Sequence, residues 1–63
     1  MKIINKETGE KIAGIITNHS MTLDEAIALV GEYHAEKAED NEPEVEIKGK
    51  LYYYDDLEMD YND

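Results

Sequence analysis

The side chains best suited to chemistry gather in the last dozen residues, YYYDDLEMDYND, where three consecutive tyrosines lead into a run of acids. The acids are Asp55, Asp56, Glu58, Asp60 and Asp63. Clustered carboxylates attract cations, and tyrosine is enriched at protein interfaces. The stretch can therefore be a binding surface that imitates a polyanion, an ion site, or a final strand followed by a solubilising tail.

The ion site is the weakest of these three interpretations. Asp56, Glu58 and Asp60 alternate as in the first half of a calcium-binding loop, but Tyr61 stands where such a loop needs glycine, and no bidentate glutamate follows. Two histidines without any cysteine make a structural zinc site improbable. The four glycines are scattered singly, so they form no phosphate-binding loop. We therefore predict no metal and no cofactor.

The sequence also gives little support to catalysis. His19 and Ser20 are adjacent, but a serine nucleophile needs a third, orienting group and an oxyanion site, and neither is indicated. We interpret the pair as a polar loop before a helix, and His34 as a histidine at the edge of the core. Paired carboxylates do acid–base work only in a pocket that separates their pKa values. We predict that the protein is not an enzyme.

The charge balance narrows the class of partner. The chain has 63 residues with 6 lysines and 16 acids, a net charge of −10, and residues 36–63 alone carry −8. Such a chain should not bind nucleic acid or anionic membranes directly, whereas a basic protein is favoured as a partner. The alternative is that the charge serves solubility alone. The absence of cysteine, of a signal peptide and of any apolar run longer than AIALV leads us to expect a cytoplasmic protein.

Two hairpins and one helix should position these groups. Residues 2–5 and 11–17 are predicted as strands around the glycine-containing turn KETGEK, and residues 11–17 are apolar on both faces, as in a central strand. TLDE is a capping box, with Thr22 as N-cap, and starts a helix from Leu23 to about Lys37. Its apolar stripe consists of Leu23, Ala26, Ile27, Val30, Tyr33 and His34. Residues 38–43 should end the helix.

The second hairpin turns around Gly49, and its register has two possible phases. A three-residue loop of residues 48–50 places four apolar side chains on one face, which are Val45, Ile47, Leu51 and Tyr53. A two-residue loop of Lys48 and Gly49 would put Lys50 on that face instead. We prefer the first phase, in which Tyr52 and Tyr54 point outward.

The predicted fold is therefore a small α+β domain of ββαββ order, with one helix packed on a mainly antiparallel sheet. The two hairpins can share one sheet, and the strand order stays open. We expect a single domain over residues 1–59 and a frayed acidic tail over residues 60–63.

Two stretches, which together make up about half of the sequence, resemble a known group of proteins. They are TNHSMTLDEAIALVG (Thr17–Gly31) and VEIKGKLYYYDDLEM (Val45–Met59). Through them the chain resembles small acidic proteins of bacterial mobile elements and phages, chiefly of Firmicutes. These have a run like TNHSM(S/T)LDEA before a helix and a hairpin like I-(D/N)-G-x-x-YYYDDL. The resemblance implies a bacterial accessory protein with a regulatory or interaction role, but it transfers no binding residues. Lys48 departs from the acidic or amide turn residue of that pattern.

Together these observations predict a non-enzymatic protein-interaction or regulatory module. The predicted partner-binding residues are Tyr52, Tyr54, Asp55, Asp56, Glu58 and Asp60. The carboxylates would accelerate association with a basic partner, and the tyrosines would supply desolvated contact. The alternative is a structural or self-associating module, a homodimer for example, that pairs through an exposed strand edge.

Overall fold

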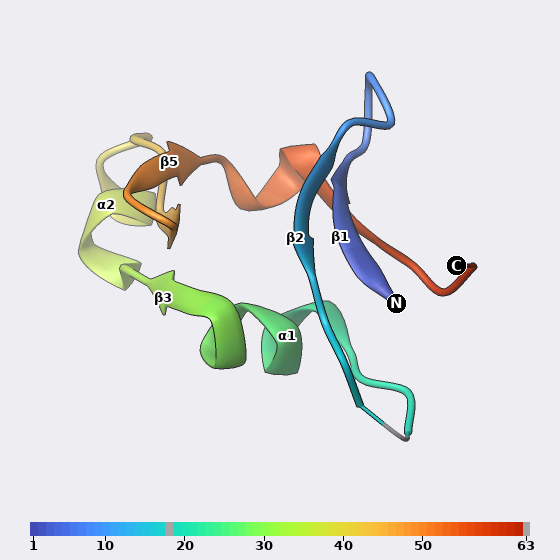
Figure 1. The fold of residues 1–63 in the computed structure, drawn as a ribbon. Helices are drawn as coiled ribbons and strands as arrows, with labels where there is room; N and C mark the ends of the chain where they lie inside the picture. Colours follow the sequence, from blue (N-terminus) through green and yellow to red (C-terminus); the bar gives the residue numbers. More distant parts are fainter. Residues whose placement is uncertain (18, 63) are drawn as a thin grey trace.

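The computed structural model describes residues 1–17 and 19–62 and confirms a small α+β fold (Figure 1). Its elements follow one another along the chain as β1 (Lys2–Asn5), β2 (Lys11–Gly14), α1 (Leu23–Val30), β3 (Gly31–Tyr33), α2 (Ala35–Glu39), β4 (Val45–Ile47), β5 (Lys50–Tyr52), the 3₁₀ helix η1 (Tyr54–Asp56) and β6 (Leu57–Asp60). The predicted order of two hairpins around a helix is thus extended by β3, α2, η1 and β6.

The first sheet has the strand order β2-β1-β6, and both of its strand pairs are antiparallel. The prediction that residues 11–17 form a central strand is wrong. The strand ends at Gly14 and lies at the edge, because β6 takes the other side of β1 and makes β1 central. Ala13 and Ile15 are buried, whereas Ile16 is fully exposed beyond the strand.

Helix α1 begins as the capping box predicts. The Glu25 amide donates to Thr22 Oγ1 at 3.3 Å, and the Thr22 amide donates to Glu25 Oε1 at 3.0 Å. These bonds satisfy two amides that a helix start leaves without an intrahelical partner. Ala26 and Ile27 on the predicted stripe are buried.

The predicted end of this helix at about Lys37 is wrong, because α1 ends at Val30. Gly31 is pressed against β4, where a Cβ atom would lie 2.1 Å from the Glu46 carbonyl oxygen and 2.8 Å from Ile47 Cγ1. The chain therefore leaves the helix and pairs with β4 as β3, and the residues after it form the separate helix α2.

The second sheet has the order β3-β4-β5, and its hairpin corrects the preferred register. Lys48 and Gly49 have φ angles of 54° and 80°, and Ile47 pairs with Lys50. Positive φ at both central residues defines a two-residue type I′ turn, which moves every later side chain by one position relative to a three-residue loop. The prediction that Tyr52 and Tyr54 point outward is therefore wrong. Both are half-buried, whereas Leu51 and Tyr53 are exposed.

The antiparallel strands form two three-stranded sheets rather than one, and α1 contacts strands of both. In Figure 1 the β1–β2 hairpin lies on one side, the β4–β5 hairpin with α2 on the other, and α1 below them. The two sheets and α1 share one hydrophobic core, which consists of Ile3, Ala13, Ile15, Ala26, Ile27, Val45, Ile47 and Leu57. No helix in residues 1–17 and 19–62 is long and apolar enough to cross a membrane.

The first two residues of the expected acidic tail (residues 60–63), Asp60 and Tyr61, contact the rest of the domain. Asp60 is the last residue of β6 and pairs with Lys2 of β1. The Tyr61 hydroxyl donates to the Met21 carbonyl oxygen at 2.6 Å. Asp63 lies outside the described residues, and the domain boundary at residue 59 stays a prediction.

Candidate functional site

The acidic stretch, which is defined here by Asp55, Asp56, Glu58 and Asp60, runs from η1 into β6. Asp55 and Asp56 lie in η1 and Glu58 in β6, and all three are exposed. Asp60 differs from them, because it is half-buried and its Oδ2 lies 3.6 Å from Lys2 Nζ. The structure therefore brings three of the four predicted carboxylates to the surface and neutralises the fourth in part.

The predicted tyrosines have a different position from the one expected. Tyr52 and Tyr54 pack against the hydrophobic core and keep only part of their surface accessible. Of the three consecutive tyrosines the exposed one is Tyr53, which is 44% exposed and donates its hydroxyl to the Asn41 carbonyl oxygen at 3.3 Å. Tyr54 also lines a pocket.

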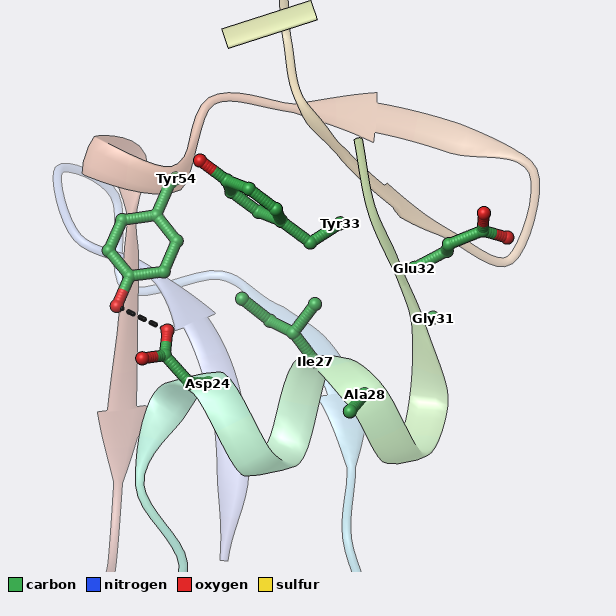
Figure 2. Close-up of a pocket in the computed structure, with 7 residues that line it drawn as sticks. All are labelled: Asp24, Ile27, Ala28, Gly31, Glu32, Tyr33 and Tyr54. Carbon is green, nitrogen blue, oxygen red and sulfur yellow. Dashed lines mark hydrogen bonds between the residues drawn. The ribbon is translucent and has the colours of Figure 1, made fainter. Parts of the chain in front are cut away.

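This pocket opens between α1, β3 and η1 and has a volume of about 650 Å³ (Figure 2). Its lining residues are Asp24, Ile27, Ala28, Gly31, Glu32, Tyr33 and Tyr54. Figure 2 shows Ile27 rising from the helix toward the two tyrosines, while the Glu32 side chain points away from Tyr33. The carboxylate that faces Tyr54 is therefore the one of Asp24.

Tyr54 is fixed by contacts at both of its ends. Its hydroxyl donates to Asp24 Oδ1 at 2.7 Å, and its backbone amide donates to Glu44 Oε1. The bond to the ionised Asp24 raises the pKa of the Tyr54 hydroxyl, because losing the proton would leave two negative charges in contact. The ring of Tyr33 meets that of Tyr54 nearly at right angles, at 88°, with 6.2 Å between the centroids.

The pocket combines an apolar floor, two aromatic rings and a carboxylate. This set suits binding better than proton transfer, because tyrosine rings and a carboxylate attract cations while the floor contacts methylene groups. The acidic stretch begins at the residue after Tyr54, so the pocket and the exposed carboxylates of η1 are neighbours. We treat the pocket and the acidic stretch together as the candidate site.

The two histidines lie outside this site. His19 is exposed, and its Nδ1 lies 3.2 Å from the carbonyl oxygen of Ser20. His34 is half-buried, as expected for the edge of the core, with its Nε2 3.3 Å from Glu46 Oε1 and its Nδ1 3.6 Å from Glu36 Oε1. Across the described part of the chain, no cluster of three or more histidine and acidic side chains has a geometry that could hold a metal ion.

Sequence reasoning missed the pocket, because its walls come from three separate segments. From the sequence, Asp24 is interpreted as a negative charge at the positive end of the helix dipole, and Tyr33 as part of the apolar stripe of a longer helix. Gly31 is the signal in the sequence that could have indicated that the helix ends before Tyr33, because glycine weakens a helix and permits close approach of another backbone.

The comparisons with known proteins add no relative. No known protein family, curated protein or solved structure matches this chain.

Proposed function

We propose that this chain is a non-enzymatic interaction module that docks on a basic protein through its acidic stretch. One observation carries the proposal, which is that Asp55, Asp56 and Glu58 are all exposed within the four residues 55–58. Among the described residues, the one lysine–carboxylate pair within 4.0 Å joins Lys2 to Asp60, so no lysine neutralises these three carboxylates by direct pairing.

The electrostatics of the whole chain support the same class of partner. With a net charge of −10, the protein attracts a basic surface over a distance set by the ionic strength. Rim charges of this kind raise the association rate and make binding sensitive to salt. A nucleic-acid-binding protein is a partner of this chemistry, since carboxylates on a rigid scaffold can occupy the positions of phosphates.

We further propose that the role is regulatory and lies in the bacterial cytoplasm, which the resemblance to small acidic proteins of bacterial mobile elements and phages supports. A protein of such an element that blocks a nucleic-acid-binding protein would relieve repression or protect the element. This finer role depends on the identity of the partner.

The test compares two variants of equal charge. The first changes the acidic stretch, Asp55→Asn, Asp56→Asn and Glu58→Gln. The control changes three exposed acids near α2, Glu39→Gln, Asp40→Asn and Glu42→Gln. Both variants and the wild type are immobilised and incubated with native bacterial lysate at low salt, and the captured proteins are identified by mass spectrometry and then purified.

For a purified partner, we expect the first variant to bind about tenfold more weakly than the wild type, from three rim charges of about 0.5 kcal/mol each. The control should keep nearly wild-type affinity. Equal losses in both variants would show that net charge alone attracts the protein, and equal affinities in all three would remove the proposal.

A second candidate function, self-association, has one observation in its favour. Strand β2 is an edge strand of its sheet, and Ile16 just beyond it is fully exposed. An exposed strand edge beside an apolar side chain can pair with a second copy. Sedimentation equilibrium should then show a dimer that Ile16→Lys dissociates, whereas a strict monomer over a wide concentration range would exclude this function.

A further inference from the structure

The pocket of the candidate site has the size and the floor of a ligand site. Its volume of about 650 Å³ lies within the range of roughly 300–1,000 Å³ that small ligands occupy. Ile27, which is 2% exposed, and Ala28 form the apolar floor on α1. Tyr33 on β3 is 48% exposed, so much of its ring is accessible.

The aromatic side of the pocket is held in place before any ligand arrives. Tyr54 donates at both ends, from its amide to Glu44 and from its hydroxyl to Asp24, and Tyr33 packs against it edge to face. A preorganised site loses less conformational entropy on binding than a mobile one. The two rings therefore form a defined surface for a partner group.

The polar side of the pocket is a carboxylate with further capacity to accept hydrogen bonds. Asp24 Oδ1 accepts the Tyr54 hydroxyl proton at 2.7 Å, and an ionised carboxylate has about four acceptor positions. Asp24 also lies in the first turn of α1, where the helix dipole stabilises a negative charge. A ligand that enters here meets an anion beside two aromatic rings.

We propose that this pocket receives an arginine side chain from the basic partner. The inference rests on the proposed function and names the group that the site recognises. A guanidinium is flat and always charged, so it can lie against a tyrosine ring while it donates to Asp24. Its methylene stem matches the floor of Ile27 and Ala28. A lysine ammonium has the charge but lacks the flat shape, and a neutral urea has the shape but lacks the charge.

The experiment uses the full chain and blocked amino acids as probes. N-acetyl-arginine amide is titrated into ¹⁵N-labelled protein and followed by amide chemical shifts. N-acetyl-citrulline amide is the neutral probe of the same shape, and N-acetyl-lysine amide is the charged probe of different shape. We expect the arginine probe to shift amides of the pocket at millimolar concentrations, and the other two to bind at least about threefold more weakly.

Two variants and two matched controls locate the binding group. Asp24→Asn keeps an acceptor for Tyr54 but removes the charge, and it should weaken the arginine probe about fivefold. Tyr33→Leu keeps an apolar side chain but removes the ring, with an expected loss of about threefold. Asp40→Asn and Tyr53→Leu make the same changes at exposed residues outside the pocket and outside the docking carboxylates, and should leave the affinity for the probe unchanged.

The outcomes separate this inference from the proposed function. Shifts confined to the pocket, and reduced by Asp24→Asn and Tyr33→Leu alone, would support it. Shifts centred on Asp55, Asp56 and Glu58, an equal response to citrulline or lysine, or no shifts at all would overturn the arginine site. Loss of partner capture in the variant of the acidic stretch would in those cases still support docking on a basic protein.

Discussion

Tyr54 combines packing against the core with a position in the proposed binding site. It packs against the hydrophobic core, lines the pocket and is followed directly by the exposed acids of η1. Its hydroxyl bond to Asp24 joins η1 to the first turn of α1, two segments that are 30 residues apart in sequence. A change at Tyr54 should therefore affect stability and the shape of the site together.

The first prediction concerns the pH dependence that this bond creates. Because the pKa of Tyr54 is raised above its ordinary value of 10.0, the folded state keeps the proton where the unfolded state loses it. The bond should contribute fully below about pH 9, and its contribution should fall as the pH rises through the folded-state pKa. Tyr54→Phe should cost about 1 kcal/mol near neutral pH, and this difference should shrink in alkali.

Urea unfolding of wild type and Tyr54→Phe between pH 7 and 11 would measure this difference. Tyr53→Phe is the control, because the Tyr53 hydroxyl donates to a backbone carbonyl rather than to a carboxylate. A stability difference for Tyr54→Phe that is constant up to pH 11 would contradict the assignment of the bond to Asp24.

At the scale of the elements, Gly31 decides where α1 ends. A Cβ atom there would lie 2.1 Å from the Glu46 carbonyl oxygen, so Gly31→Ala must push β3 away from β4. We predict that this substitution destabilises the protein by about 2–3 kcal/mol, as overpacking does in cores. In a helix that continued to Lys37 the same substitution would stabilise by up to about 1 kcal/mol, so the sign distinguishes the two structures.

Thermal unfolding followed by circular dichroism would give that sign. Ala28→Gly is a useful reference, because Ala28 is exposed within α1 and its substitution should cost about 1 kcal/mol through helix propensity alone. A gain in melting temperature for Gly31→Ala would contradict the close packing of β3 against β4.

The features that the sequence predicted correctly are those set by near neighbours. The start of α1 depends on Thr22 and Glu25, which are three residues apart, and strand β1 follows from its own composition. The exposure of Asp55, Asp56 and Glu58 follows from their charge. Local chemistry was sufficient for each of these features.

The features that were missed depend on contacts between distant segments. The end of α1 is set by β4, the central position of β1 by β6, and the hairpin register by a lysine that adopts a positive φ of 54°. An L-residue rarely adopts this conformation, which costs roughly 1–2 kcal/mol, so Lys48 gave no signal of a type I′ turn. The pocket was missed for the same reason, because it joins Asp24, Tyr33 and Tyr54.

At the scale of the whole molecule, the charge that would attract the proposed partner also opposes folding. The protein carries −10 within principal extents of 35 × 22 × 18 Å. At about 0.01 M salt the screening length is about 30 Å, so nearly all carboxylates repel one another, and at about 0.1 M it falls to about 10 Å. The compact state concentrates these charges more than the unfolded chain does.

The last prediction follows from this repulsion. Raising sodium chloride from about 0.01 M to about 0.1 M should stabilise the wild type by about 1 kcal/mol, equivalent to about 4–8 °C in melting temperature for a domain of this size. Replacing Asp55, Asp56 and Glu58 by their amides should stabilise the protein at low salt, with a benefit that shrinks as salt rises. Partner binding should change in the opposite direction, because the same screening weakens attraction to a basic surface.

Calorimetry of unfolding and of partner binding over one salt series would test whether salt stabilises the fold and weakens binding. If salt instead destabilised the wild type, the acids would have to be neutralised within the fold. No unpaired charge would then be left for the proposed partner to recognise.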